Sequence, residues 1–425
     1  MTKPTGPICN LDCKYCFYLE KERLYPSQTN WKMAPETLES YIRQHIESQS
    51  VHEVTFAWQG GEPTLMGLDY FREVVQLQQR FGADRRIVNA FQTNGVLLDD
   101  DWCRFFAEHK FLLGISLDGP EAIHDHYRVD RGGKPSFRRV MRGLEFLQKH
   151  RVEFNTLTTV NRINSYQPLE VYRFLKSIGS LVMQFIPVVE RTAENPSSDG
   201  LSLVSPEHRG QASVTDWSVE GEQYGRFLCS IFDEWVVQDV GRHFVQLFDI
   251  TLESHMEMPQ SLCWFRERCG AALALEHNGD LYSCDHFVYP ENRLGNILEQ
   301  PLLALVNSPQ QKAFGDAKAD SLPRQCRECE VRFACNGECP KHRFLRTDDG
   351  EDGLNYLCAG YLRFFRHVQP YMQFMAGQLR ARRSPTEVMN YAPRLEKAFQ
   401  AASADQPCPC GSQRQFEHCC GRTRS

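Results

Sequence analysis

The grouping of its cysteines constrains this chain more than any other feature of the sequence. The chain has 17 cysteines among 425 residues, and most of them stand in close-spaced groups. An odd number argues against a complete set of internal disulfides, and clustered thiols in a reducing compartment more often bind metal. Cys103 and Cys229 stand alone in the sequence. A lone cysteine in an apolar setting is usually a small buried side chain. The grouped cysteines therefore predict metal sites.

The bulk composition limits the kind of protein that carries these sites. A chain of this length, with 41% hydrophobic residues, is long enough for a large barrel and an appended module. A net charge of -6 disfavours a basic surface for nucleic acid. Residues 1–7 lead into the first cysteine motif without the apolar core of a signal peptide, and no apolar stretch approaches a membrane span. We expect a soluble, cytoplasmic protein that binds neither nucleic acid nor a membrane.

From about residue 50 to 190, strand-like apolar runs alternate with amphipathic helical patterns. The expected strands are 51–58, 86–92, 111–117, 154–160 and 181–188. The expected helices are 70–81, 102–109, 138–150 and 169–178, followed by a polar loop at 190–215 and a helix at 224–238. Repeated strand–helix units favour a parallel sheet with right-handed crossovers, either open or closed into a barrel.

The first cysteine group is Cys9, Cys13 and Cys16, with C-x3-C-x2-C spacing. Three thiolates can hold three irons of a [4Fe–4S] cluster and leave the fourth iron open to another ligand. A structural zinc site would need a fourth protein ligand, such as a distant histidine. Spacing alone leaves both interpretations open.

Short motifs at the ends of the expected strands favour the iron–sulfur interpretation. They are Trp58–Pro63 (WQGGEP), Gln92–Gly95 (QTNG), Ser116–Pro120 (SLDGP) and Ile186–Val189 (IPVV). Strand ends are where barrel enzymes build their sites, glycines admit close approach, and the Glu62 carboxylate can take an ammonium group. With the cysteine motif, these segments resemble the radical SAM superfamily, whose members bind S-adenosylmethionine (SAM). The resemblance implies a partial (β/α)6 TIM-type barrel of α/β class.

The same resemblance assigns further residues to SAM. Arg128 suits the SAM carboxylate because its guanidinium is a planar fork of donors, although a salt bridge on a helix surface is the alternative. Besides Glu62, the implied SAM contacts are Tyr15, Gln59, Gly61, Ser116, Arg128 and Val189.

Eight further cysteines lie between residues 263 and 358, where the strand–helix rhythm stops. Two four-cysteine sites fit this number, and zinc ribbons are the alternative to iron–sulfur clusters. The pattern resembles the SPASM domain of peptide-modifying radical SAM enzymes, which interleaves its ligands. By that resemblance, auxiliary cluster one is held by Cys263, Cys269, Cys284 and Cys339. Auxiliary cluster two is held by Cys326, Cys329, Cys335 and Cys358.

A closer resemblance extends from Cys9 to about Tyr361. The segments FQTNG, SLDGP, LGN and LNYLCAGY are similar to those of anaerobic sulfatase-maturating enzymes. The family implies three [4Fe–4S] clusters and radical SAM oxidation of a Cys or Ser side chain in an unfolded sulfatase to Cα-formylglycine. It also implies a flavodoxin- or ferredoxin-type reductant. The alternatives are a SPASM enzyme that crosslinks or epimerises a peptide, and a non-catalytic Fe–S electron carrier or zinc adaptor.

Asp285 is the candidate catalytic base in this interpretation. It follows Cys284 directly and matches the position of the family's catalytic aspartate. A carboxylate near its ordinary pKa is ionised at neutral pH and can accept the substrate proton. The neighbouring His286 is a weaker candidate. A turn aspartate bonded to its own backbone is the structural alternative.

The C-terminal cysteines are Cys408, Cys410, Cys419 and Cys420. Four soft ligands on a short segment suit tetrahedral zinc, with His418 as a substitute for one of them. The tail resembles the SEC-C motif of a preprotein translocase ATPase. We expect a loose tether at 403–406, and the resemblance implies docking to export or chaperone machinery.

These motifs divide the chain into four parts. The expected parts are a radical SAM core at 1–240, a SPASM domain at 241–375, a helical segment and linker at 376–407, and the zinc tail at 408–421. Residues 364–400 are expected to be helical and carry the basic patch Arg380–Arg383.

Overall fold

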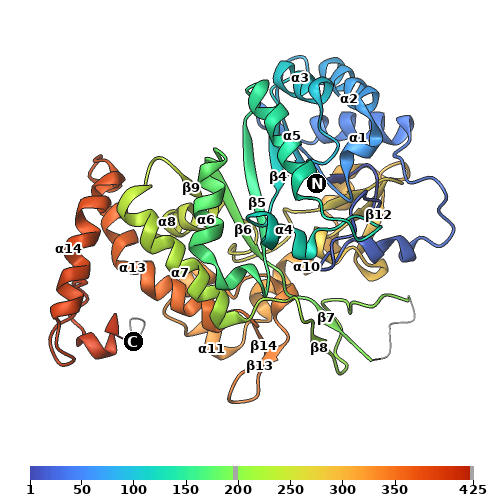
Figure 1. Ribbon diagram of the computed structural model, residues 1–425. Coiled ribbons are helices and arrows are strands. Elements are labelled where there is room, and N and C mark those ends of the chain that lie inside the picture. Colours follow the sequence, from blue (N-terminus) through green and yellow to red (C-terminus); the bar gives the residue numbers. More distant parts are fainter. Residues whose placement is uncertain (195–199, 422–425) are drawn as a thin grey trace. The chain divides into compact units, whose positions relative to one another are not determined.

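The computed structural model describes residues 1–194 and 200–421 (Figure 1). The chain forms two compact units, each assembled from three segments. The first unit comprises residues 1–159, 188–218 and 268–320, and the second comprises residues 160–187, 219–267 and 321–425. Among the described residues, no helix has both the length and the apolar character needed to cross a membrane.

The first unit is built on a mostly parallel sheet. Its strands run in the order β12-β11-β10-β1-β2-β3-β4-β5. From β10 to β5 neighbouring strands are parallel, while β11 and β12 add an antiparallel edge. The strands are β1 (Thr2–Lys3), β2 (Glu53–Trp58), β3 (Arg86–Thr93), β4 (Leu112–Ser116), β5 (Phe154–Val160), β10 (Ala274–Glu276), β11 (Asp280–Tyr282) and β12 (Arg293–Asn296). The predicted α/β class with a parallel central sheet is confirmed.

Helices follow the parallel strands of this unit, as the alternating pattern predicts. Helix α1 shows why: its apolar side chains recur on one side and are buried, as Leu38 and Ile42 are. Asp99 begins α3 by accepting a hydrogen bond from Trp102 N, which is an N-cap. The helices are α1 (Pro35–Glu47), α2 (Leu68–Phe81), α3 (Asp100–Glu108), α4 (Glu121–Tyr127), α5 (Phe137–Lys149), α9 (Leu302–Val306) and α10 (Pro309–Asp320).

The polar loop expected at 190–215 contains a small ladder. Strands β7 (Arg191–Thr192) and β8 (Ser213–Val214) pair antiparallel within it. Glu20 accepts hydrogen bonds from Ser202 N and Leu203 N, so this segment is bonded to the region that follows the first cysteine motif. Residues 195–199 of the expected loop lie outside the described residues.

The second unit is mainly helical. Its strands are the parallel pair β6 (Val182–Pro187) and β9 (Phe244–Val245), and the hairpin of β13 (Leu345–Arg346) and β14 (Asp352–Leu354). Its helices are α6 (Pro168–Ser177), α7 (Gly221–Gln238), α8 (Gln246–His255), α11 (Arg324–Arg327), α12 (Arg332–Cys335), α13 (Cys358–Arg380) and α14 (Val388–Ala401).

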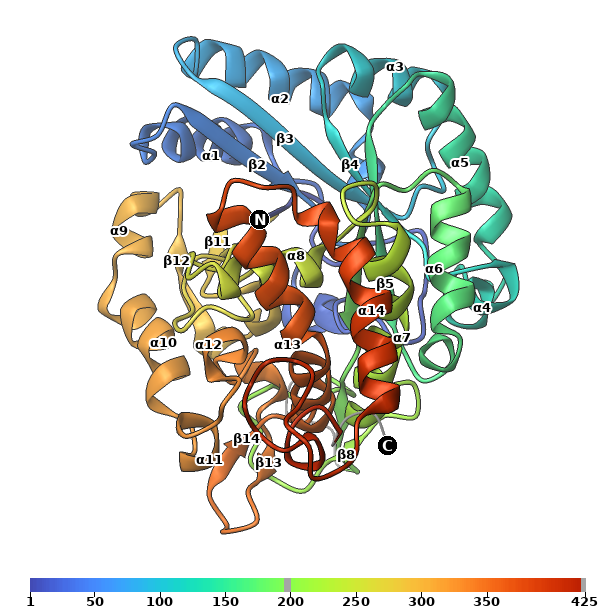
Figure 2. The same cartoon turned by 90° about the vertical axis from the view of Figure 1, so that its left-hand side faces the viewer.

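Helices α7 and α13 form the core of the second unit, and Figure 2 shows α14 beside them. They approach closely at two glycines: a Cβ on Gly225 would lie 2.5 Å from the Cα of Gly360. The region 364–400 is helical, as expected, and is divided between two helices. The first ends at Arg380, since Arg382 takes a left-handed φ of 55° within the basic patch, and α14 begins at Val388.

Candidate active site

The first three cysteines lie on one loop that follows strand β1. Cys16 N donates a hydrogen bond to Cys13 O at 2.9 Å, and Leu11 N donates to Cys9 Sγ at 3.3 Å. Burial raises the pKa of Cys13 to about 12 and of Cys16 to about 11, so metal must displace their protons. Three neighbouring thiols and a backbone donor aimed at one sulfur fit a [4Fe–4S] cluster with one open iron.

Two glycines at the end of β2 position this loop. Gly61 N donates to Gly6 O at 2.8 Å, and Glu62 N donates to Ile8 O at 2.9 Å. A Cβ on Gly61 would lie 2.0 Å from Ile8 O, and Gly60 has a φ of 129°. Only glycine fits there, because the cysteine loop crosses the end of β2 in direct backbone contact. The close approach that the sequence predicts at these glycines is therefore made by the chain's own backbone.

The Glu62 carboxylate, a predicted SAM contact, is buried and hydrogen-bonded. Oε1 accepts from Thr64 Oγ1 at 2.7 Å and from Thr93 Oγ1 at 2.8 Å, and Oε2 accepts from Asn94 N at 2.8 Å. Burial raises the pKa of this carboxyl, and the hydrogen bond from Asn94 opposes that shift. Glu62 thus ties the end of β2 to the end of β3.

Arg128 forms a buried ion pair with Asp118. Its Nε lies 3.0 Å from Asp118 Oδ2, and its second terminal nitrogen donates to Oδ1 at 3.1 Å. Tyr15 donates its hydroxyl proton to Oδ2 at 2.5 Å. The guanidinium also acts on Cys13, where it lowers the thiol pKa against the effect of burial. The salt bridge that the sequence left open for Arg128 is present, but it is buried beside the cysteine loop.

The remaining predicted SAM residues all belong to the first unit. Gln59 and Ser116 stand at the carboxyl ends of β2 and β4, where Gln92 Nε2 donates to Ser116 Oγ at 3.0 Å. The Gln59 amide contacts the Met1 sulfur. Val189 is buried in the segment 188–218. These positions agree with a site at the carboxyl edge of parallel strands.

Asp285, the candidate base, begins a short 3-10 turn directly after Cys284. Its Oδ1 lies 2.5 Å from the ammonium nitrogen of Lys3, and the Asp285 side chain is 17% exposed. Burial alone would raise the pKa of Asp285, but Lys3 and His286 hold it below its usual range. Asp285 is therefore an ionised carboxylate at neutral pH.

The cysteines assigned to auxiliary cluster two lie together in the second unit. Cys326 and Cys329 share a turn in which Cys329 N donates to Cys326 O. Cys358, the first residue of α13, interacts electrostatically with both of these thiols, and Cys335 interacts with Cys358. Four thiols at one place suit a [4Fe–4S] cluster.

The four cysteines assigned to auxiliary cluster one divide between the units. In the first unit, Gln311 Nε2 donates to Gly270 O and Ser283 O, the neighbours of Cys269 and Cys284, at 3.2 Å each. In the second unit, Cys339 is buried and Cys263 is half-buried. Asn336 Nδ2 donates to Phe265 O at 2.8 Å, which joins the segments that carry Cys263 and Cys339.

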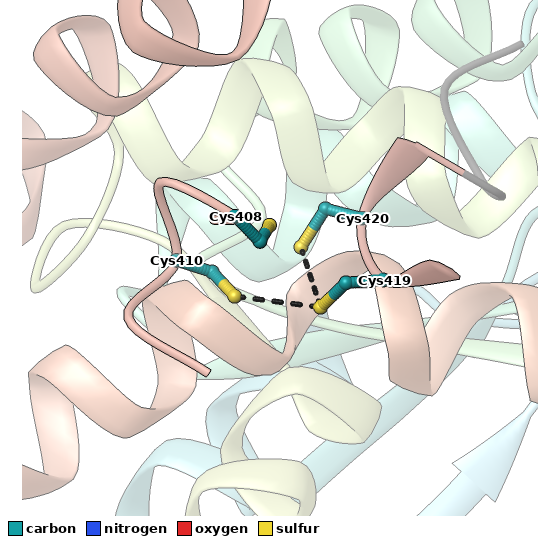
Figure 3. A group of neighbouring side chains, drawn as sticks. All are labelled: Cys408, Cys410, Cys419 and Cys420. Carbon is teal, nitrogen blue, oxygen red and sulfur yellow. Dashed lines mark hydrogen bonds between the residues drawn. The ribbon is translucent and has the colours of Figure 1, made fainter. Parts of the chain in front are cut away.

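The four tail cysteines converge on one point, as Figure 3 shows. Their ligand atoms all lie within 4.8 Å of one another. The sulfur of Cys419 lies 3.5 Å from that of Cys410 and 3.9 Å from that of Cys420. Tetrahedral zinc with Zn–S bonds of about 2.3 Å requires sulfur–sulfur distances of about 3.8 Å. His418 is outside this group, and its ring lies 3.5 Å from Glu417.

The segment before the tail is not the loose tether that the sequence suggested. Phe416 N donates to Gln406 O, and Glu417 N donates to Ala404 O. The ring of Phe416 also stacks on Phe399 of α14 at 5.9 Å between centroids. The expectation of a loose tether was wrong because backbone bonds join both sides of the tail.

Lys3 is the residue of the candidate site that sequence reasoning missed. A two-residue strand carries no periodic pattern, and its partner Asp285 lies far along the chain. The only sequence signal is a charged residue within an otherwise uncharged segment that leads into the cysteine motif.

Comparisons with known proteins agree with this geometry. A profile of the radical SAM superfamily matches residues 4–175, the SPASM iron–sulfur cluster-binding domain matches 263–330, and the SEC-C motif matches 406–422. A serine-type anaerobic sulfatase-maturating enzyme of Bacteroides thetaiotaomicron is 48% identical over 92% of this chain and 94% of its own length. A cysteine-type enzyme of Clostridium perfringens is 30% identical over 89% of this chain and 98% of its own length.

A solved structure extends the similarity to the fold. It is described as native anSMEcpe with bound AdoMet and the Cp18Cys peptide. The TM-score is 0.77 at 31% sequence identity, with 89% of this chain and 98% of that chain covered.

Proposed function

Because this chain belongs to the anaerobic sulfatase-maturating enzymes, we propose that it oxidises a Ser or Cys side chain of a sulfatase polypeptide to Cα-formylglycine. The identity of 48% to a serine-type enzyme, along nearly the full length of both chains, carries this proposal. The identity to the cysteine-type enzyme is lower, which favours serine as the preferred target.

The chain's own residues have separable tasks in this reaction. Cys9, Cys13 and Cys16 would hold the first cluster, and SAM bound to that cluster would supply the radical chemistry that removes a hydrogen atom from the substrate Cβ. SAM is oriented beside the cysteine loop by hydrogen-bond donors and acceptors that lie at the carboxyl ends of β2, β3 and β4. Asp285 accepts the proton from the substrate hydroxyl or thiol, and its ionised state favours that role.

The remaining assignments follow from the same reaction. The substrate is bound as an unfolded segment in the cytoplasm, and a flavodoxin- or ferredoxin-type protein supplies electrons. The SAM contacts are Tyr15, Gln59, Gly61, Glu62, Ser116, Arg128 and Val189. The radical SAM core is assigned to 1–240, the SPASM domain to 241–375, the helical linker to 376–407 and the tail to 408–421.

Mass spectrometry of a sulfatase-motif peptide tests the proposed function. The anaerobically reconstituted enzyme is reduced with dithionite and incubated with SAM and with two peptides that differ only by Ser or Cys at the target. Formylglycine in the serine peptide, together with 5′-deoxyadenosine, supports the proposal. Cleavage of SAM with a crosslinked or epimerised peptide instead would identify a different SPASM enzyme.

The tail is proposed to hold one zinc ion through Cys408, Cys410, Cys419 and Cys420. Hydrogen bonds from Cys420 and Ser412 lower the pKa of the Cys410 thiol, and the thiolate is the form of cysteine that binds zinc. Replacing Cys410 and Cys419 by serine is expected to remove zinc and leave the iron content unchanged. Metal analysis of the purified variant measures both, and retained zinc would contradict the assignment.

The tail is further proposed as a docking element for export or chaperone machinery, through which the enzyme reaches unfolded sulfatases. Docking would raise the effective substrate concentration without altering the chemistry. Deleting residues 404–425 is expected to leave turnover of a short peptide unchanged and to lower maturation of a co-expressed sulfatase. Equal losses in both assays would show that the tail only stabilises the fold, as its contact with Phe399 of α14 would allow.

A further inference from the structure

Lys3 occupies an unusual position for a cationic side chain. It lies on the central strand β1, which pairs in parallel with β10 on one side and with β2 on the other. The Lys3 side chain is 3% exposed. Desolvating an ammonium group is costly unless an opposite charge lies beside it, so the local partner determines what this residue does.

The partner of Lys3 is the candidate base. Its ammonium nitrogen lies 2.5 Å from Asp285 Oδ1 and 3.8 Å from the centroid of the Tyr18 ring. The Tyr18 hydroxyl contacts Glu276, which stands opposite Lys3 in the ladder of β1 and β10. Asp285 N bonds to Ala272 O at 3.3 Å, so both its backbone and its carboxylate are held.

This arrangement restrains the Asp285 carboxylate through one of its oxygens. Oδ1 faces a buried ammonium that is held by a sheet strand and an aromatic ring, so the orientation of the carboxylate is restricted. A general base removes a proton faster when its carboxylate is already held in the reactive orientation. Small displacements of a catalytic group lower the reaction rate strongly.

We infer that Lys3 is a positioning residue that holds the Asp285 carboxylate in the orientation needed to take the substrate proton. The inference rests on the proposed function. In that reaction the Cβ hydrogen atom passes to the SAM-derived radical, the hydroxyl or thiol proton passes to Asp285, and one electron leaves to an iron–sulfur acceptor as the double bond forms. Lys3 exchanges neither proton nor electron.

The test compares substitutions at Lys3 in the complete, reconstituted enzyme. Lys3→Met removes the charge and keeps most of the volume, while Lys3→Arg keeps the charge. The substrate is a peptide deuterated at the target Cβ, and the measurements are deuterium in 5′-deoxyadenosine and formylglycine formed per 5′-deoxyadenosine. Deuterium transfer reports substrate placement and hydrogen abstraction, whereas the ratio reports the later oxidation.

The Lys3→Met variant is expected to transfer deuterium to 5′-deoxyadenosine normally. Its yield of formylglycine per 5′-deoxyadenosine is expected to fall about tenfold or more. Lys3→Arg is expected to restore most of the ratio. Lys21→Met is the matched control, since Lys21 is also buried and lies 3.1 Å over the Tyr289 ring but is not the partner of Asp285. Its ratio should match that of the wild type.

An unchanged ratio in Lys3→Met, or an arginine variant no better than methionine, would overturn the inference. Should Lys3→Met fail to retain iron, Lys3→Gln is judged by the same two criteria. Asp285→Asn, assayed in parallel, separates this failure from that of the proposed function. A normal yield of formylglycine per 5′-deoxyadenosine in Asp285→Asn would reject Asp285 as the base. A low yield in Asp285→Asn together with a normal yield in Lys3→Met would reject only the role of Lys3.

Discussion

Replacing Cys9, Cys13 and Cys16 together by alanine is expected to abolish SAM cleavage and leave iron for two auxiliary clusters. The three thiols share one loop, and their removal eliminates the protein ligands of the cluster that meets SAM. The auxiliary cysteines lie elsewhere in the sequence, so their clusters should assemble normally. Iron and sulfide analysis after anaerobic reconstitution measures the clusters, and 5′-deoxyadenosine formation with dithionite measures cleavage.

A matched control uses the two cysteines that bind no metal in this assignment. Cys103 and Cys229 are buried within α3 and α7. Replacing both by alanine should leave the iron content and SAM cleavage unchanged, apart from a loss of stability from the smaller side chains. SAM cleavage by the triple variant, or loss of all iron from it, would refute the ligand assignment.

Asp285→Asn is expected to separate radical formation from substrate oxidation. The amide has nearly the same shape as the carboxylate but cannot accept the substrate proton. Formylglycine formation should fall by about two orders of magnitude or more, the usual loss for a general base. 5′-Deoxyadenosine should still form, because the SAM-cleaving cluster is bound by other residues. Mass spectrometry of the peptide and chromatography of the nucleoside measure the two steps.

His286 supplies the control for this substitution. It is the next residue along the same 3-10 turn, and its ring packs against Phe17 at 5.5 Å. His286→Gln should retain formylglycine formation if Asp285 is the base. Undiminished oxidation in Asp285→Asn, together with a loss in His286→Gln, would transfer the role to the histidine.

The sequence predicts the regular elements of the sheet well. Expected strands at 86–92 and 154–160 correspond to β3 at Arg86–Thr93 and β5 at Phe154–Val160. Alternation of buried and exposed side chains is a local property, so it is readable without knowledge of the fold. The break between α13 and α14 was missed, because a left-handed arginine at 382 has no compositional signal of the kind that glycine provides.

The sequence predicts those parts of the candidate site that depend on the spacing of residues within a motif. It does not predict which side chains from different motifs contact each other. Cysteine spacing predicts the metal ligands, and the strand-end motifs predict the edge of the sheet at which the site lies. Neither reveals that Asp118 pairs with Arg128, or that Glu62 accepts hydrogen bonds from Thr93 and Asn94. The Glu62 contacts depend on β2 and β3 becoming neighbours, and the pairing of Asp118 with Arg128 depends on how the chain turns back through α4. No local pattern encodes either.

The backbone contact at Gly60 and Gly61 bears on how the enzyme recovers from exposure to oxygen. The cysteine loop is joined to the end of β2 by main-chain hydrogen bonds, which do not depend on iron. The segment that leads into Cys9 is therefore expected to stay at the end of β2 whether or not iron is bound. Reloading of a lost cluster should then need no refolding of this segment.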